Sequence, residues 1–266
     1  MTAGLMTHTW KFTDLEFVVL WEDFGEAGVP RPFSFTSRTP LWDDYLVEQA
    51  QTRAALLASS TPARKEMLDD LYRPDIRIRV IAFDGRDHTN VANNVRLMGA
   101  RRADRGYLVT QLPGETVGHS GGFVVTECAA VELADVVVRA LPEAEPGKRA
   151  DIVLAAETED EHLDYDYGAS VVRDSFEGSV HDRSTEFLTA PAVRFGFIDV
   201  IQAQSIFGPR GMTRHRLKWR DLEGDGRYVI DDRHPPVATA ADKRRLVSVI
   251  NTRVAEVVRA IKDERG

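Results

Sequence analysis

The pattern that most limits how this chain can fold is a series of predicted strands, closed by a helix, that occurs twice. In the first copy, Ile76, Ile78 and Val80 alternate with arginines, which is the two-residue period of a strand with one wet face. Further strands and a helix are predicted downstream, over 94–101, 107–111, 122–126 and 130–141. Turn-forming residues join the second and third strands, which predicts an antiparallel hairpin.

The same order returns 113 to 121 residues later, which is the scale of a duplicated half-domain. The matching segments are 191–197, 216–218, 228–229, 237–239 and 246–254. We therefore predict an α+β fold with one domain over 1–266, in which two β-β-β-α halves, about 10–142 and 150–264, form a quasi-two-fold antiparallel sheet covered by helices. Chance likeness between two β-β-β-α units is the alternative.

Helices are also predicted before and between the two halves. Three N-terminal helices should begin at Thr13, Thr39 and Thr61. Glu16 completes a capping box at the first of these, and a proline follows the threonine at each of the other two. A short strand is expected over 33–37, and the segment 171–188 is expected to be helical in part.

Charge and cysteine content exclude several classes of function. The 42 acidic and 34 basic side chains give a net charge of -8, which repels a phosphate backbone and argues against general nucleic-acid binding. The single Cys128 can form neither an internal disulfide nor a cysteine zinc site. The first ten residues do not resemble a signal peptide, and no segment approaches the roughly 20 apolar residues that span a bilayer. A cytoplasmic protein without membrane insertion is expected.

Residues 118–122, Gly-His-Ser-Gly-Gly, match the nucleophile elbow of α/β-hydrolases. An elbow requires a strand before the serine and a helix after it, whereas here a Pro-Gly segment precedes Ser120 and a strand-like Phe-Val-Val-Thr follows. A glycine-rich loop that enters a strand is the favoured interpretation, and no enzyme is predicted. A serine hydrolase with Ser120 as nucleophile and His181 or His234 as base is the alternative function.

Two acidic segments contain side chains that could act as metal ligands. Asp221, Glu223 and Asp225 precede Gly226 as in a calcium loop, but a predicted strand comes before them, which favours a tight hairpin turn. The six carboxylates within 157–166, next to His162, are interpreted as a solvated acidic face. Neither a metal ion nor a cofactor is predicted.

A basic stripe runs along one predicted strand, where Arg214, Arg216, Lys218 and Arg220 share a face. Four cations in a row can bind an acidic partner or a phosphate-rich ligand. The favoured alternative is a solvated outer face whose cations pair with acids on neighbouring strands.

Both ends of the chain resemble the EspG family of ESX secretion-associated proteins. At the N-terminal end the resemblance lies in Phe12–Trp21 and its continuation Val29–Phe33. At the C-terminal end it lies in Leu217–Tyr228, followed by a Pro-Pro-Val strand and a long final helix. The order of strands and helices in between also fits, so the resemblance spans nearly the whole chain.

The resemblance implies a non-catalytic, cytosolic chaperone of type VII secretion in actinobacteria. Its partner would be the helical tip of a PE–PPE-type heterodimer, which the chaperone keeps soluble and delivers for export; weak homo-oligomerisation is compatible with this role. By position, the binding segments would be 84–93 and 159–188. The candidate partner-binding residues there are Asp84, Arg86, Asp87, His88, Asn90, Val91, Glu161, Tyr165, Tyr167, Phe176 and Phe187. A plain hairpin loop is the alternative for 84–93.

Overall fold

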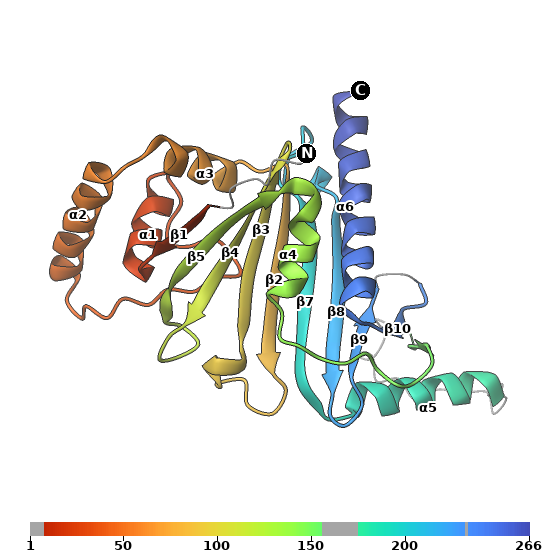
Figure 1. Cartoon of the computed structure of the whole chain (residues 1–266). Coiled ribbons are helices and arrows are strands. Elements are labelled where there is room, and N and C mark those ends of the chain that lie inside the picture. The colour runs from red at the N-terminus through yellow and green to blue at the C-terminus, as the bar shows by residue number, and fades with distance from the viewer. Residues whose placement is uncertain (1–7, 156–174, 232–233) are drawn as a thin grey trace, which may run out of the picture.

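The computed structural model describes residues 8–155, 175–231 and 234–266 (Figure 1). The strands are β1 (Thr9–Phe12), β2 (Ile76–Asp84), β3 (Val95–Arg102), β4 (Arg105–Pro113), β5 (Ser120–Ala129), β6 (Ile152–Val153), β7 (Ala192–Gln202), β8 (Arg214–Leu222), β9 (Arg227–Ile230) and β10 (Val237–Ala240). The helices are α1 (Asp14–Glu22), α2 (Trp42–Ala58), α3 (Pro62–Tyr72), α4 (Leu133–Arg139), α5 (Ser175–Thr189) and α6 (Lys243–Arg265).

The strands form one antiparallel sheet in the order β1-β5-β4-β3-β2-β7-β8-β9-β10-β6. Its central pair joins the first strand of each predicted half, with Val80 of β2 opposite Ile198 of β7. On the two sides of this pair, β3-β4-β5 and β8-β9-β10 follow in chain order. Counted outward from the β2–β7 pair, β3 and β8, β4 and β9, and β5 and β10 occupy equivalent positions. These are the strands that the sequence repeat matched to one another.

One face of the sheet is covered by α4 and α6, which lie side by side across its middle (Figure 1). Below them, Val80 and Ile198 are fully buried, together with Val137 of α4 and Ile250 of α6. Each fully buried side chain of this size contributes about 1.5–3 kcal/mol through the hydrophobic effect. This core extends over both halves and holds the central strands together.

The opposite face carries a second core, which is restricted to the β1 side of the sheet. There α1 and α3 pack on β3, β4 and β5, and the rings of Phe17 and Phe123 stack with centroids 4.2 Å apart. Helix α2 packs outside α1, where Gln49 donates a 2.9 Å hydrogen bond to Glu22. No residue of β7 or β8 belongs to this second core.

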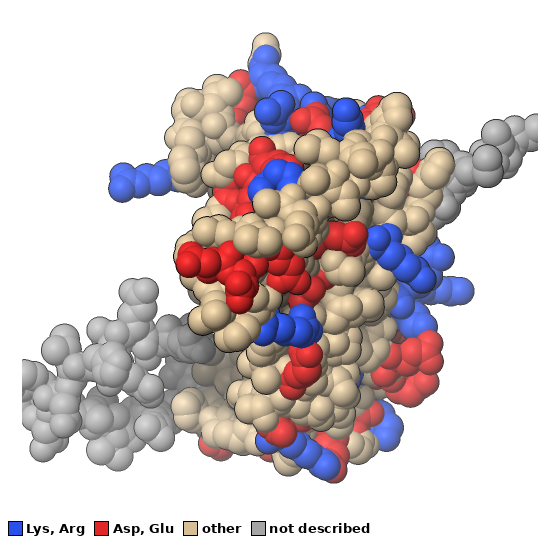
Figure 2. All heavy atoms as spheres, turned by 90° about the vertical axis from the view of Figure 1, so that its left-hand side faces the viewer, with Lys and Arg blue, Asp and Glu red and all other residues tan. Residues whose placement is uncertain are grey.

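Figure 2 shows the molecule from the side on which α2 lies. Acidic side chains gather along the middle of this face, and much of the remaining surface is uncharged. Helix α2 contributes exposed apolar side chains to the protein surface, among them Trp42, Val47 and Leu57. No helix within the described ranges combines the length and the hydrophobicity that a membrane span requires.

Most elements predicted from local signals are confirmed, beginning with the capping box of α1. Thr13 Oγ1 accepts a hydrogen bond from Glu16 N at 3.2 Å, and Glu16 Oε2 accepts one from Thr13 N at 2.8 Å. Helix α3 begins after Thr61, whose hydroxyl caps it, whereas α2 begins after Leu41, two residues later than predicted. Both predicted hairpin turns, at 103–106 and 223–226, are present.

The prediction of a strand over 33–37 is wrong. This segment has no regular structure, because its polar groups bond to side chains and to a loop instead of a neighbouring strand. Ser34 N donates to Gln111 Oε1 at 3.0 Å, and Ser34 Oγ donates to Val117 O at 3.0 Å. The edge strands β1 and β6 were not predicted.

Candidate partner-binding surface

The loop between β2 and β3 is organised by the carboxylate of Asp84, which ends β2. Its Oδ2 accepts hydrogen bonds from the side-chain amides of Asn93 at 2.7 Å and Asn90 at 3.0 Å. Its Oδ1 accepts from the backbone N–H groups of Arg86 at 2.8 Å and Asp87 at 3.0 Å. The bond from Asn93, followed by the other three, holds the pKa of Asp84 well below its ordinary value. The loop is thus fixed around one ionised side chain.

The base of this loop lies directly against β7. Gly85 N donates a 3.0 Å hydrogen bond to Val193 O, and a Cβ atom at position 85 would lie 1.8 Å from Ala192 O. Only glycine permits this approach of two backbones. On the solvent side, the exposed guanidinium of Arg86 forms an ion pair with Glu223 in the β8–β9 turn.

The C-terminal end of α5 is anchored on the outer strands of the second half. Phe187 is fully buried and packs edge-on against Tyr228, with ring centroids 5.3 Å apart. The guanidinium of Arg220 lies 5.8 Å from the centre of the Phe187 ring and donates to Leu188 O at 2.6 Å and to Ala190 O at 2.7 Å. These contacts satisfy carbonyl groups that a helix end would otherwise leave unpaired.

The β2–β3 loop and the end of α5 meet at one surface depression of about 520 Å³. His88 contributes from the loop, Leu188 from α5, and Phe195 and Phe197 from the outer face of β7. The His88 and Phe195 rings lie 5.4 Å apart, and Lys218 lies at the side of β8. An apolar floor with polar and cationic groups at its margin is typical of a protein-binding surface.

The candidate residues predicted from the sequence lie at several different places in the structure. Of the candidate residues, His88 lines the depression, whereas Val91 lines a separate shallow hollow beside the β4–β5 loop. Phe187 is a core residue in this structure, because its ring fills the space between α5 and β9. The other candidates in the first segment, Asp84, Arg86, Asp87 and Asn90, lie in or directly before the loop. Glu161, Tyr165 and Tyr167 lie outside the described residues, as does the side chain of Phe176.

Sequence reasoning missed Leu188, Phe195 and Phe197. A signal for the two phenylalanines was present, because they alternate with buried positions of β7 and therefore share the face opposite the one that α4 and α6 cover. Both rings are half-buried and border the depression.

Ser120 does not have the geometry of a nucleophile elbow. It is the first residue of β5, its side chain is buried, and no helix follows it. Its hydroxyl accepts a hydrogen bond from Gly122 N at 3.1 Å and lies 3.2 Å from Gly122 O. The neighbouring His119 is bonded through Nδ1 to the Thr116 hydroxyl at 2.8 Å. The serine is thus held within a strand end and is not presented to a substrate.

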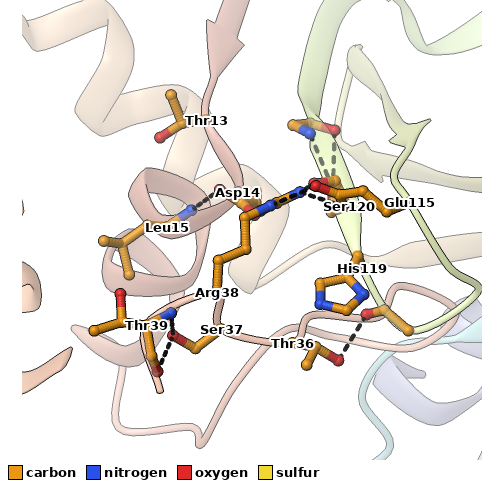
Figure 3. A network of polar contacts seen from close by, with 12 residues as sticks. Thr13, Asp14, Leu15, Thr36, Ser37, Arg38, Thr39, Glu115, His119 and Ser120 are labelled. Carbon is orange, nitrogen blue, oxygen red and sulfur yellow. Dashed lines mark hydrogen bonds and ion pairs between the residues drawn. The ribbon is translucent and has the colours of Figure 1, made fainter. Parts of the chain in front are cut away.

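The same strand end is fixed by Arg38, which Figure 3 shows between the start of α1 and the β4–β5 loop. Arg38 forms ion pairs with Asp14 and with Glu115, the latter at 2.7 Å, and donates to Ser120 O at 2.9 Å. The hydrogen bond from Arg38 is the main cause that lowers the pKa of Glu115 to about 2. This network joins the start of α1 to the β4–β5 loop and to the start of β5.

The carboxylates of the proposed calcium loop have other partners. Asp221 forms a buried, two-bond ion pair with Arg227, at 2.7 and 2.9 Å. Asp225 accepts hydrogen bonds from Lys148 N at 2.7 Å and from the Tyr228 hydroxyl at 2.9 Å. Both interactions stabilise the hairpin turn that was favoured from the sequence. Among the described residues, no group of three or more His, Cys, Asp or Glu side chains is arranged to hold a metal ion.

Comparison with known proteins supports the resemblance noted in the sequence. Residues 13–252 match the model of the EspG family. The chain belongs to the EspG family. Its fold is similar to that in the solved structure of the Mycobacterium tuberculosis type VII secretion system chaperone EspG5 in complex with the PE25–PPE41 dimer. The TM-score is 0.51 at 10% identity, with 94% of this chain and 96% of that chain covered. No curated protein sequence matches the chain.

Proposed function

We propose that this EspG-family protein is a type VII secretion chaperone whose partner is a helical heterodimer of the PE–PPE type. The proposal is supported by the family match and by the similar fold of EspG5, which was solved with a PE25–PPE41 dimer. The observation that carries it is the depression where the β2–β3 loop meets the end of α5. These are described parts of the two segments that the family resemblance assigned to partner binding.

The physical role of such a surface is to cover an apolar helical tip before export. An exposed apolar tip associates with other copies of itself, because water disfavours its surface. Phe195, Phe197 and Leu188 offer apolar contact area, while His88 and Lys218 offer polar contacts at the margin. A mixed surface of this kind binds with enough affinity to keep the partner soluble and still releases it.

We further propose that the chaperone works in the cytoplasm as one domain and has no catalytic activity. The two β-β-β-α halves would be related by a quasi-two-fold axis between β2 and β7. The palindromic strand order around this pair supports that relation.

The test compares two exposed leucines on two helices. Leu188→Asp introduces a carboxylate into the depression. Leu57→Asp makes the same substitution at an exposed position of α2 that does not line the depression. Each variant is titrated by calorimetry with the PE–PPE-type heterodimers encoded in the same genome. We expect Leu188→Asp to weaken binding about tenfold or more, because a carboxylate would be buried in an apolar contact. Leu57→Asp should bind as the wild type does.

Two results would overturn the proposal. One is that none of the heterodimers binds the wild-type protein. The other is that one binds but Leu188→Asp and Leu57→Asp affect its affinity equally, which would place the contact elsewhere on the molecule.

A further inference from the structure

A second depression, of about 540 Å³, lies on the face of β2, β7 and β8 that the N-terminal core does not include. Its cations are Arg31, Arg79, Arg96, Arg214 and Arg216, and its acid is Asp199. Five arginines and one carboxylate give a formal excess of four positive charges, although the whole chain carries -8. We call this surface the arginine groove.

The one carboxylate in the arginine groove is shared by several of its cations. Asp199 Oδ1 accepts from Arg216 Nε at 2.7 Å, and Oδ2 accepts from Arg214 Nη2 at 2.7 Å, while Arg79 Nη2 lies 3.7 Å away. The prediction that the basic stripe pairs with acids on a neighbouring strand is therefore confirmed for two of its members. Because three guanidinium groups meet one carboxylate, most of their charge is left without an acidic partner.

Burial makes two of the groove's arginines energetically costly to the fold. Arg79 and Arg96 are partly buried, and burial lowers the pKa of both. Arg79 Nε has no hydrogen-bond partner, and the Arg96 guanidinium contacts the neutral hydroxyl of Ser34. Arg79 shares Asp199 with two other arginines, and among the described residues Arg96 bonds only to a neutral hydroxyl. Desolvated cations whose charge is not balanced destabilise a fold, so an anion placed between them would be bound favourably.

The groove also has apolar walls. Phe33 lies on the side of the N-terminal segment, and Ile81 and Phe197 project from β2 and β7. The Arg216 guanidinium lies 5.4 Å from the centre of the Phe197 ring, in a cation–π arrangement. A free phosphate would use the arginines alone, whereas a peptide with both carboxylates and apolar side chains would also contact these walls.

From this combination we infer that the arginine groove is a docking site for an acidic amphipathic segment of a partner protein. It adjoins the depression beside the β2–β3 loop, with which it shares Phe197. A helix fits this place well, because helices are the usual cover of a sheet face and α4 and α6 cover the opposite face of the same strands. The carboxylates of the segment would pair with Arg31, Arg79 and Arg96, and its apolar stripe would lie on Ile81 and Phe197.

The test uses a synthetic amphipathic helical peptide with glutamates beside a leucine stripe, titrated against the full chain. Arg31→Glu reverses a charge on an exposed segment without regular structure, so it leaves the sheet intact. Arg96→Gln removes a partly buried charge on β3 that the proposal assigns to the partner, and its fold is checked by thermal unfolding. The matched control is Arg259→Glu on the exposed side of α6, which makes the same charge change as Arg31→Glu.

We expect Arg31→Glu and Arg96→Gln each to weaken peptide binding about tenfold or more, since a charge-assisted hydrogen bond is worth that much. Arg259→Glu should bind as the wild type does, and added salt should weaken binding. Equal effects of Arg31→Glu and Arg259→Glu would overturn the inference. It would also be overturned if a peptide with glutamine in place of glutamate bound equally well, or if inorganic pyrophosphate bound more tightly than the peptide.

Discussion

Removal of the Phe187 ring should release the C-terminal half of α5 from the sheet and leave the sheet folded. The ring is fully buried between α5 and Tyr228, and the substitution Phe187→Ala leaves a cavity in its place. Truncation of a buried phenylalanine costs about 3–5 kcal/mol, of which the edge-on contact with Tyr228 accounts for about 0.5–1.5 kcal/mol.

Two other side-chain contacts near the end of this helix are weaker. The exposed ion pair between Arg149 and Glu186, at 2.9 Å, contributes at most about 1 kcal/mol. The hydrogen bond from Ala155 N to Ser184 Oγ, at 3.0 Å, contributes about 1 kcal/mol. A loss of 3–5 kcal/mol raises the opening equilibrium between about a hundredfold and a few thousandfold. Among the described contacts, the Phe187 ring is thus the main apolar anchor of the helix, beside the hydrogen bonds that Arg220 donates to Leu188 O and Ala190 O.

Native-state amide hydrogen exchange measures this opening directly. In Phe187→Ala, the amides over 181–189 should exchange faster by that factor, while those of β2 and β7 keep most of their protection. The control is Leu188→Ala, where the lost side chain is 42% exposed and the cost should be small. The reasoning is refuted if both variants raise exchange equally, or if β2 and β7 lose protection together with α5.

Three further predictions concern the loop, the pH response and the thiol. Asp84→Asn removes the charge that the β2–β3 loop encloses, so the amides of residues 86 and 87 should exchange faster than in the wild type. The pKa of Glu115 is lowered from 4.5 to about 2 in the folded protein. The ion pair with Arg38 therefore stabilises the fold fully above pH 4.5, and this stabilisation is lost as the pH falls through about 2. The difference in denaturation midpoint between Glu115→Gln and the wild type should therefore shrink over that interval. Burial raises the pKa of Cys128 from 9.0 to about 11, so alkylation of the native protein should be at least about a hundredfold slower than in denaturant.

Local chemistry in the sequence was sufficient for the elements that carry their own signals. The Thr13 capping box, the glycine-containing turn before β9 and the alternation of β2 each depend on residues within one turn or strand. The unpredicted β1 depends on a partner more than a hundred residues away, because Thr9 pairs with Thr126. Four residues at a sheet edge carry too little pattern to be recognised without that partner.

The candidate surface was less accessible from the sequence. The segments 84–93 and 159–188 were assigned to partner binding by the family resemblance. Nothing in their composition indicated that they lie close together in the fold. They meet because β2 pairs with β7, which brings Asp84 opposite Arg194 and places the loop beside the end of α5. The internal order of the loop depends on where two asparagine side chains point, which one chain's sequence does not specify.

The β2–β7 pair also determines when this protein can finish folding. During synthesis β2 leaves the ribosome more than a hundred residues ahead of β7. Until β7 is available, β2 is therefore an unpaired edge strand of the first half of the sheet. Such an edge is a template for any other strand, including the β2 edge of a second nascent copy. The nascent chain therefore passes through a stage at which the strand that later lies at the centre of its sheet is exposed as an edge.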